Sequence, residues 1–493
     1  MSANGRGKAI MVLGTTSDAG KSMMTMAICR ILSDMGYSVC PFKSQNMSLN
    51  AKPTSCGHEI SMIQELQCMA ARTEPTFRVN PILLKPACDM KSQVVVEGKV
   101  FGTYDVSGYY DDFIPNHSFG IVKNNLDELL SRFDYVVMEG AGSPAEINIY
   151  DSDIANMGAA KMADADCILV TNVEWGGSFA YLLGTIMLIP EDDRKRIKAV
   201  IYNNLRGSPD SIKEGAAMIE EMTGIPVLGI VPHISNRLPN EDSECFRNIK
   251  ETGTGSTVIG VIRVPRIANF TDLDPLYGED VTVRFVTEPS ELDTCDAIVL
   301  PGTKNTTSDL RWVKESGIGD KIVSMKGKVP ILGICGGYQM LGRMLSDPDG
   351  REDPSIKEIE GLGLLDVVTE WGDGDKVTVR NEGTFLKTGE PVKGYQIHLA
   401  RSKVNGPPLF RIESGDEGCC DDENMVYGTY LHGILEKPAF RRFFLDRIRP
   451  GLAKESVYDE YDVNLEAEIA KVTACVKDSI DMELFRRTFM GVE

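Results

Sequence analysis

Short apolar runs alternate with amphipathic segments along residues 8–231. Six runs have the length of buried strands: KAIMVLG, YSVCPFK, YVVMEGAG, CILVTN, KAVIYNN and VLGIVP. After the first run, residues 21–36 place five apolar side chains on one helical face, namely Met24, Ile28, Ile31, Leu32 and Met35. Gly36 follows as the expected C-cap. This alternation predicts a parallel sheet with crossover helices.

A second alternating block begins at residue 257 and continues to about residue 447. Its strand-like runs are TVIGVIRVP, VTVRFV, AIVLPG, VPILGIC, GYQIHLA and VYGTYLHGIL. The polar, turn-rich residues 233–256 between the blocks predict a linker. We therefore expect an α/β protein of two doubly wound domains, residues 1–232 and 257–447. Residues 448–493 are charged and partly helical in pattern, and we expect a C-terminal extension there.

Composition narrows the functional classes. The 493 residues carry a formal net charge of −20, which argues against non-specific binding to nucleic acid or to an anionic membrane. No apolar run approaches the roughly 18 residues of a membrane span, and the N-terminus has no secretory pattern. Twelve cysteines, mostly scattered singly and without a CxxC pair, fit reduced thiols in the cytoplasm and make a structural zinc site unexpected. The oligomeric state stays open.

A phosphate-binding loop is predicted where the first strand meets the first helix. Its candidate residues are Gly14, Thr15, Asp18, Gly20, Lys21 and Ser22. Gly20 lets backbone N–H groups surround phosphate oxygens, Lys21 suits the β- and γ-phosphates of ATP, and Ser22 suits Mg²⁺. Asp18 is a weaker metal or nucleotide candidate. The first glycine, Gly14, stands one residue earlier than in the usual phosphate-loop pattern. The alternative interpretation is a helix-opening turn that contains the sequence GKS without binding phosphate.

Two charged residues at other strand ends complete this site in our interpretation. Glu139 ends the predicted strand YVVME and is a candidate Mg²⁺ ligand, directly or through water. Lys43 lies just past the second strand, at the edge where ligands bind in open α/β sheets. A solvated strand-end glutamate and an ordinary surface lysine are the alternatives. The layout resembles the dethiobiotin-synthetase-like ATPases, a resemblance that implies phosphorylation of a substrate carboxylate by ATP.

The stretch PILGICGGYQML at residues 330–341 has the pattern of a nucleophile elbow. Cys335 ends a predicted buried strand and is followed by two glycines and a helix. The helix N-terminus favours a thiolate nucleophile, and the backbone N–H of Gly336 is a candidate oxyanion donor. We expect a second donor near Gly302 and Thr303. A buried structural cysteine is the alternative, but it does not explain the flanking glycines.

A catalytic cysteine needs a base, and two histidines follow Cys335 in the second block. His432 in YLHGIL is our candidate, whereas His398 in GYQIHLA is expected to be a packing or hydrogen-bonding histidine. The motifs GICGGYQ and YLHG resemble the triad-type glutamine amidotransferases. Most of them carry a glutamate two residues after the histidine, where this chain has Ile434. That departure resembles the branch acting on corrin carboxylates, and Glu436 is a possible orienting residue.

The whole chain, from about residue 8 to 447, resembles the cobyric acid synthases. Segments that carry the match include PFKSQNMSLN, NPILLKP, SQVVVEGK and MEGAGSPAEIN. The resemblance implies amidation of the b, d, e and g carboxylates of adenosylcobyrinic a,c-diamide with glutamine, ATP and Mg²⁺. Trp175 and Asn204 replace residues that are usually Arg and Lys in that family, and Trp175 is alternatively a packing aromatic.

Three other functions compete with this interpretation. A cobyrinic acid a,c-diamide synthase has the same two-part plan and acts on different carboxylates. A CTP synthase also joins the two activities, but its histidine is followed by Pro-Glu. The third possibility is a P-loop switch protein with an inert second domain, against which the pair Cys335 and His432 argues.

Overall fold

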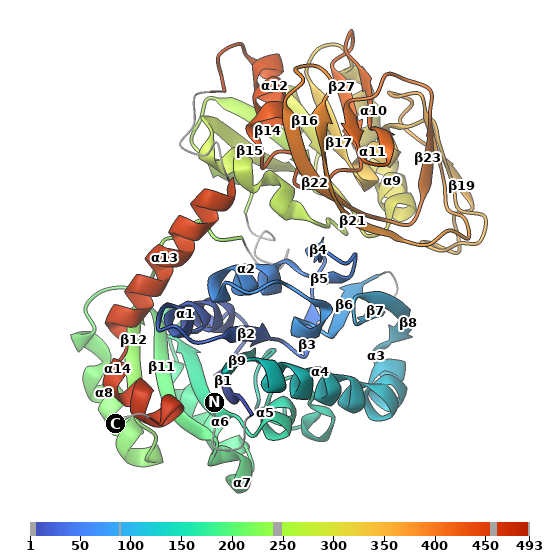
Figure 1. The fold of residues 1–493 in the computed structure, drawn as a ribbon. Coiled ribbons are helices and arrows are strands. Elements are labelled where there is room, and N and C mark those ends of the chain that lie inside the picture. The colour runs from blue at the N-terminus through green and yellow to red at the C-terminus, as the bar shows by residue number, and fades with distance from the viewer. Residues whose placement is uncertain (1–5, 88–89, 240–248, 454–460, 492–493) are drawn as a thin grey trace.

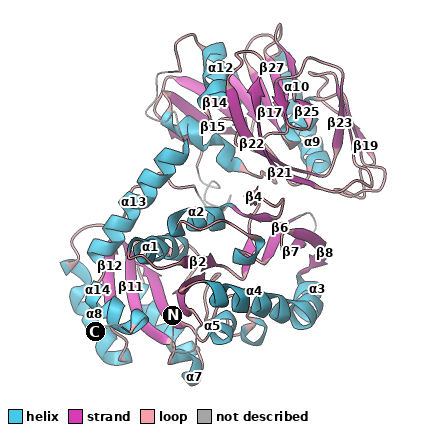
Figure 2. Cartoon of the chain, viewed as in Figure 1, coloured by secondary structure: helices cyan, strands magenta, loops and turns pink. Residues whose placement is uncertain are grey.

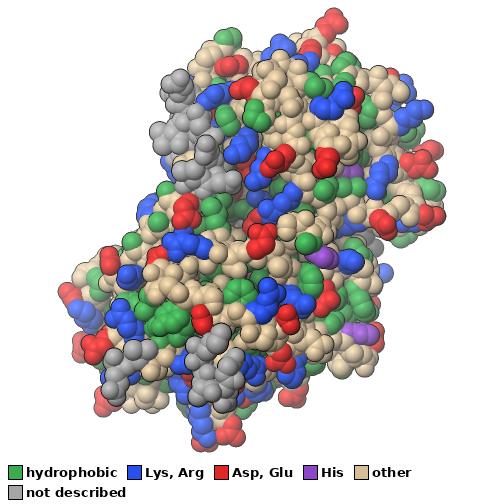
Figure 3. Space-filling model, in the orientation of Figure 1, with side chains coloured by type: hydrophobic (Ala, Val, Ile, Leu, Met, Phe, Trp, Pro, Cys, Tyr) green, Lys and Arg blue, Asp and Glu red, His purple; other side chains and the backbone are tan. Residues whose placement is uncertain are grey.

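The computed structural model describes residues 6–87, 90–239, 249–453 and 461–491. It has two α/β lobes, and a long helix runs alongside both (Figure 1, Figure 2). We call residues 6–239 and 461–491 the N-terminal lobe and residues 249–453 the C-terminal lobe. Within the described residues no helix is long and apolar enough to cross a bilayer. On the face in Figure 3, cationic and anionic side chains are interspersed.

A parallel six-stranded sheet forms the centre of the N-terminal lobe. Its order is β12-β11-β10-β1-β9-β2. The strands are β1 (Lys8–Gly14), β2 (Val39–Phe42), β9 (Tyr135–Glu139), β10 (Asp166–Asn172), β11 (Ile197–Leu205) and β12 (Val227–Pro232). All six coincide with apolar runs that predicted strands. Because β1 pairs in parallel with β9 and β10, the chain leaves these three strands at one edge of the sheet.

Helices cover both faces of this sheet. The helices of this lobe are α1 (Lys21–Asp34), α2 (Met62–Ala71), α3 (Val106–Gly108), α4 (Phe119–Arg132), α5 (Met157–Ala163), α6 (Ser178–Leu188), α7 (Glu191–Arg194) and α8 (Asp210–Thr223). Short helical turns are η1 (Phe77–Val79), η2 (Tyr109–Ser118) and η3 (Tyr150–Ser152). The predicted apolar face of α1 is buried at Met24, Ile28, Ile31 and Leu32. Gly36, with φ 89°, follows the C-cap residue Met35.

A second, smaller sheet lies between the main sheet and the C-terminal lobe. Its order is β3-β6-β7-β8, with β3 (Gln45–Met47), β6 (Ile82–Pro86), β7 (Lys91–Val96) and β8 (Lys99–Asp105). One face contributes Leu84 and Val94 to the N-terminal core, and the opposite face packs Leu83 and Val95 against Ile397 of the other lobe. The hairpin β4 (Ala51–Pro53) and β5 (Glu59–Ser61) lies beside it.

The C-terminal lobe is built on a seven-stranded sheet in the order β13-β15-β14-β16-β17-β27-β26. Its strands are β13 (Glu251–Gly253), β14 (Thr257–Ile262), β15 (Val281–Val286), β16 (Ala297–Leu300), β17 (Ile331–Ile334), β26 (Cys419–Asp421) and β27 (Val426–Thr429). Its helices are α9 (Thr306–Glu315), α10 (Ile318–Ser324), α11 (Gly336–Leu341) and α12 (Pro438–Ile448), with turns η5 (Phe270–Gly278) and η6 (Pro289–Thr294).

Two four-stranded sheets complete this lobe. One contains β18 (Met344–Ser346), β19 (Glu358–Glu360), β20 (Val367–Glu370) and β23 (Arg401–Val404). The other contains β21 (Val377–Phe385), β22 (Pro391–His398), β24 (Phe410–Ile412) and β25 (Gly415–Glu417). The predicted strand GYQIHLA is therefore part of a side sheet, outside the central parallel one.

The end of the chain returns to the N-terminal lobe. The long helix α13 (Tyr461–Ser479) packs against α1, and α14 (Met482–Phe485) and η7 (Arg486–Met490) follow it (Figure 1). Ile469, Val472 and Val476 join the apolar core beneath α1. The extension thus completes a core that also contains Ile10 and Val12 of β1. Residues 240–248 of the predicted linker and 454–460 of the extension lie outside the described residues.

Candidate active sites

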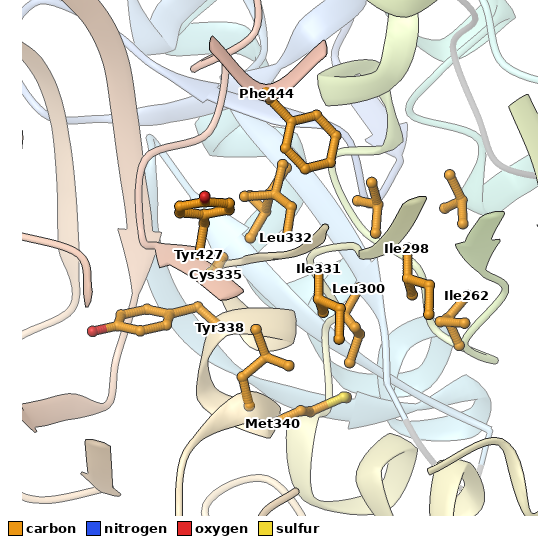
Figure 4. Close-up of a cluster of buried hydrophobic side chains, with 14 of the residues drawn as sticks. Ile262, Ile298, Leu300, Ile331, Leu332, Cys335, Tyr338, Met340, Tyr427 and Phe444 are labelled. Carbon is orange, nitrogen blue, oxygen red and sulfur yellow. The ribbon is translucent and has the colours of Figure 1, made fainter. Parts of the chain in front are cut away.

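Cys335 lies at a strained turn between β17 and α11. Its backbone has φ 51° and ψ −106°, a conformation that non-glycine residues rarely adopt. A Cβ added to Gly336 would lie 2.6 Å from Thr303 Cγ2, and one added to Gly337 would lie 2.0 Å from the Leu300 carbonyl oxygen. The two glycines are therefore needed for helix α11 to approach β16. Figure 4 shows Cys335 at the end of the buried strand that contains Ile331 and Leu332.

His432 faces this cysteine and is held by a carboxylate. Its Nδ1 hydrogen-bonds Asp272 Oδ2 over 2.7 Å, and the other oxygen of Asp272 accepts the N–H of Gly433 over 2.7 Å. All three of His432, Asp272 and Cys335 are buried. Because Asp272 engages Nδ1, the Nε2 nitrogen is the one left for the thiol and the leaving group.

Electrostatics favour the charged form of His432 at this site. Burial disfavours an imidazolium, but the carboxylate of Asp272 and the thiolate of Cys335 outweigh it and raise the pKa of His432 to about 10. An imidazolium next to a cysteine stabilises the thiolate, which is the nucleophilic form.

Asp272 is the residue that sequence reasoning missed, and Glu436 does not take that position. The Glu436 carboxylate binds Lys52 Nζ of the N-terminal lobe over 3.2 Å. Asp272 stands 160 residues before His432, in the turn η5, so no local spacing joins the two. The sequence DLDP, which begins with Asp272, has the composition of an ordinary turn and does not indicate a catalytic residue.

His398 lies in the same cavity in another role. Its Nδ1 is 2.8 Å from the carbonyl oxygen of Ala400, and its ring stacks on Tyr430 with centroids 4.0 Å apart. Burial lowers the pKa of His398 to about 4, so its ring is neutral near pH 7. This agrees with the expected hydrogen-bonding histidine.

The cavity beside Cys335 has a volume of about 450 Å³ and is lined by both lobes. Lys85 and Gln93 come from the small sheet of the N-terminal lobe, and Lys304 and Lys376 come from the C-terminal lobe. Gly302 lies against the imidazole, since a Cβ there would be 2.9 Å from His432 Cε1. Likewise, a Cβ added to Gly336 would lie 3.1 Å from the backbone nitrogen of Thr303. The backbone of 302–303 and that of Gly336 therefore border one small space beside the thiol.

The phosphate loop lies at the edge of the main sheet of the N-terminal lobe. Gly20 has φ 98°, and a Cβ there would lie 2.0 Å from Asn203 Nδ2, so only glycine fits. Thr15 Oγ1 hydrogen-bonds Thr171 Oγ1 over 3.1 Å and ties the loop to β10. Asp18, with φ 52°, is exposed at the tip of the loop.

Lys21 folds over the loop. Its Nζ donates to the carbonyl oxygens of Thr16 over 2.8 Å and Gly142 over 2.9 Å. A Cβ on Gly14 would lie 2.9 Å from Lys21 Nζ, so the early glycine of the motif leaves room for this side chain. The lysine thus holds the phosphate loop against the segment that follows Glu139.

Glu139 is the centre of the predicted cluster. Its Oε1 accepts hydrogen bonds from Ser22 Oγ over 2.8 Å and from Lys43 Nζ over 2.6 Å, and its Oε2 accepts from Gln67. Glu139 and Lys43 are both buried, so neither is a solvated surface residue. The structure brings Ser22, Lys43 and Glu139 together as the sequence pattern proposed.

The same cluster suits Mg²⁺ in part. A serine hydroxyl and a carboxylate oxygen 2.8 Å apart are hard oxygen donors of the type that binds Mg²⁺ together with phosphate oxygens and water. Among the described residues no group of three or more His, Cys, Asp or Glu could hold a metal alone. The donors therefore fit a cation that arrives with a nucleotide, and they do not form an all-protein cage.

Trp175 and Asn204, the two residues that differ from the usual family pattern, lie on the sheet edge next to the phosphate loop. Trp175 is 59% exposed, so its interpretation as a packing aromatic is wrong. Asn204 has φ 61° in β11, and its neighbour Asn203 donates to the Ala19 carbonyl oxygen of the loop over 3.0 Å. Arg206 pairs with Glu174 over 2.7 Å and retains a cation in this region.

Two family models match the chain. The CobQ/CobB/MinD/ParA nucleotide binding domain matches residues 10–244, and the CobB/CobQ-like glutamine amidotransferase domain matches residues 258–440. These two stretches contain the phosphate loop and the cysteine site, respectively.

Curated relatives match over nearly the full length. The chain is 42% identical to the probable cobyric acid synthase of Methanothermobacter thermautotrophicus, over 98% of this chain and 99% of the relative. It is 41% identical to the cobyric acid synthase of Clostridium acetobutylicum, over 98% of this chain and 99% of the relative. It is also 42% identical to that of Geobacillus thermodenitrificans, over 96% of each chain.

Proposed function

The chain belongs to the cobyric acid synthase family, and we propose that it uses glutamine and ATP to amidate corrinoid carboxylates in cobalamin synthesis. The substrate we propose is adenosylcobyrinic a,c-diamide, amidated at its b, d, e and g carboxylates to give adenosylcobyric acid. Glutamine supplies the nitrogen at Cys335, and ATP activates each carboxylate at the phosphate loop.

The glutamine half of the reaction follows from Cys335, His432 and Asp272. The Cys335 thiolate attacks the side-chain amide carbon of glutamine, and oxygen takes up the negative charge. N–H groups of Gly336 and of the Gly302–Thr303 segment stabilise that oxyanion. His432 gives a proton to the departing nitrogen, so ammonia leaves and a thioester remains. His432 then takes a proton from water, which hydrolyses the thioester to glutamate.

The ATP half follows from the groups around Glu139. The N–H groups at the start of α1 and Lys21 hold the phosphates, with Thr15 and Gly20 shaping the loop. Mg²⁺, with Ser22 and Glu139 as proposed ligands, neutralises phosphate charge when bound. A substrate carboxylate attacks the γ-phosphorus, ADP leaves, and an acyl phosphate forms. Ammonia attacks its carbonyl carbon, phosphate departs, and the amide results.

Lys43 supports the carboxylate end of this chemistry. It is buried and forms an ion pair with Glu139 over 2.6 Å, beside Ser22 of the phosphate loop. We assign it to the developing negative charge during phosphoryl transfer. We assign Asp18, exposed at the loop tip, to contacts with the nucleotide.

The observation that carries the proposal is the coexistence of both centres in one chain of this family. The decisive assay incubates the protein with cobyrinic a,c-diamide, glutamine and Mg-ATP and follows amidation by mass spectrometry. Four mass steps of one amidation each support the proposal. Activity on cobyrinic acid but not on its a,c-diamide would instead indicate the a,c-diamide synthase.

A further inference from the structure

The hairpin β4–β5 of the N-terminal lobe lies against the strands behind the catalytic histidine. Its strand β4 packs on β21 and β22 of the C-terminal lobe (Figure 1). Ala51, the first residue of β4, belongs to a small buried apolar cluster, and Ile397 of β22 packs against that cluster. The carbonyl oxygen of Pro53, the last residue of β4, accepts a hydrogen bond from Arg380 Nε of β21 over 2.6 Å. Both ends of β4 are therefore held on the other lobe.

Asn269 of the C-terminal lobe binds the backbone of this hairpin. Its side-chain Oδ1 accepts the N–H of Ala51 over 3.3 Å, and its Nδ2 donates to the carbonyl oxygen of Ala51 over 3.2 Å. The same Nδ2 donates to Tyr395 Oη over 3.1 Å, and the backbone N–H of Asn269 donates to the carbonyl oxygen of Leu49 over 3.3 Å. Asn269 is 4% exposed, so these bonds are shielded from water.

The place of Asn269 in the chain connects this contact to the catalytic carboxylate. Asn269 is the residue before η5, the turn that carries Asp272, and it has a left-handed φ of 51°. An asparagine in this position usually caps its own helical turn, but the side chain of Asn269 makes no capping bond. Its carbonyl oxygen accepts the N–H of Asp272 over 3.0 Å. Fixing Asn269 on the hairpin therefore fixes the start of the turn from which Asp272 reaches His432.

A second path leads from Asn269 to the histidine through Tyr395. Tyr395 and His432 exchange two backbone hydrogen bonds, over 3.0 and 2.8 Å, and their rings stack with centroids 5.3 Å apart. Asn269 thus contacts both the turn that carries Asp272 and the strand residue behind the imidazole. A base has to keep its orientation while it transfers protons, so a small displacement of this pair would lower the rate of hydrolysis.

We propose that Asn269 is a positioning residue of the glutamine site and that the hairpin of the N-terminal lobe is its anchor. Docked on Ala51, Asn269 holds the turn of Asp272 and the ring of Tyr395, and through them it orients His432 toward Cys335. The N-terminal lobe, which carries the phosphate loop, then also contributes to the rate of glutamine hydrolysis. The inference rests on the proposed function, because it requires glutamine to be hydrolysed at Cys335.

A direct contact with glutamine is the competing explanation, because Asn269 also lines the cavity beside Cys335. The two roles differ in their kinetic signature. Loss of a contact made equally in the bound substrate and the transition state raises KM and leaves kcat unchanged, whereas a misplaced base lowers kcat.

The test is steady-state glutamate release by the full chain with Mg-ATP and cobyrinic a,c-diamide present. Asn269→Gly permits the left-handed backbone and removes the side chain. We expect kcat to fall about tenfold while KM stays within about twofold. Ala51→Leu enlarges a buried residue of the hairpin and should lower kcat by a similar factor from the other lobe. Because both changes break one contact, the double variant should stay within about twofold of the slower single variant.

Asn424→Ala is the matched control. It removes another asparagine side chain of the C-terminal lobe, one that donates to Asp421 Oδ2 over 2.7 Å, and kcat should stay within about twofold. Ammonium-supported amidation by Asn269→Gly should likewise stay within about twofold, because the phosphate loop is unaltered. If Asn269→Gly does not fold, Ala51→Leu tests the same anchor with the same expectation.

Three results would overturn the inference. They are an unchanged kcat in folded Asn269→Gly, a raised KM at unchanged kcat, and fully additive losses in the double variant. The second result would instead assign Asn269 to direct contact with glutamine. Wild-type protein that releases no glutamate contradicts the proposed function itself.

Discussion

The cysteine site and the phosphate loop differ in how complete they are without ligands. His432 already contacts both Cys335 and Asp272, with Asp272 Oδ2 2.7 Å from His432 Nδ1. At the phosphate loop, in contrast, the cationic groups bind protein oxygens. Lys21 binds the carbonyl oxygens of Thr16 and Gly142, and Lys43 binds Glu139.

The chemistry of the ligands explains this difference. Glutamine is uncharged at its reacting end, so all reactive groups of its site are supplied by the protein and can be assembled in advance. ATP is a polyanion, and a loop that awaits it has to satisfy its cations with its own oxygens until phosphate replaces them. The comparison predicts that the two sites fail independently, which mutation can test.

The largest effect is expected from Cys335→Ala. Glutamine hydrolysis should fall by at least about 10⁴-fold, because the variant has no other nucleophile at the elbow. Amidation with ammonium chloride should persist, since carboxylate activation lies in the other lobe. Glutamate release and corrinoid amidation are measured side by side. Loss of both in a folded variant would contradict two separable sites.

His432→Ala should lower glutamine hydrolysis by about 10²–10⁴-fold, the usual range for lost acid–base catalysis. His398→Ala serves as the control, because His398 is neutral and bound to a carbonyl oxygen, so its loss should affect glutamine binding or stability. Steady-state rates of glutamate release decide between them. A near-normal His432→Ala beside an inactive His398→Ala would reverse the assignment of the base.

Lys21→Ala should reduce amidation by about 10²–10³-fold with either nitrogen source, as expected when a charge that stabilises the phosphoryl group is removed. Glutamine hydrolysis should be affected much less, because Cys335 and His432 lie in the other lobe. ADP formation and amide formation are measured together. Normal ammonium-dependent amidation would show that the phosphate loop is assigned wrongly.

Asp272→Asn sharpens the electrostatic part of the comparison. Asp272 helps to raise the pKa of His432 to about 10, so the imidazolium persists up to that pH in the wild type. Without the carboxylate the pKa should move back toward the ordinary 6.5. The alkaline limb of glutamine hydrolysis should therefore shift to lower pH, and the rate near pH 7 should fall about fourfold, because only about a quarter of the imidazole stays protonated there when its pKa is 6.5. A pH profile of kcat/KM measures both, and an unshifted limb would contradict the role of Asp272.

Most of the architecture could be predicted from the sequence because parallel strands are buried on both faces and appear as continuous apolar runs. The phosphate loop and the elbow were recognisable for a related reason, since each joins a strand directly to a helix and its residues are neighbours in sequence. Ser22, Lys43 and Glu139 converge because parallel strands end at one edge of the sheet.

Contacts between distant segments could not be predicted. Asp272 reaches His432 across 160 residues, and α13 returns to the first lobe after the whole second lobe has been completed. Polar residues such as Gln64 and Gln67 resemble a solvated helix face in sequence, yet they are fully buried because this face of α2 packs inward, where Gln64 bonds Asn46 and Gln67 bonds Glu139. Such placements depend on packing between segments that are distant in sequence, for which hydrophobic periodicity carries no signal.

The smallest effect is expected from Glu436→Gln. Glu436 is four residues after His432, which made it the sequence-based choice for the orienting residue, but its carboxylate binds Lys52 of the other lobe over 3.2 Å. Asp272 already engages Nδ1 of His432, so the substitution should change glutamine hydrolysis by no more than about twofold, the effect of one weak ion pair. Lys52→Met removes the partner from the opposite lobe and should have a similarly small effect. Thermal unfolding of both single variants and the double variant measures the coupling, which we expect to be below about 1 kcal/mol. A loss of hydrolysis by Glu436→Gln as large as that of Asp272→Asn would return the orienting role to Glu436.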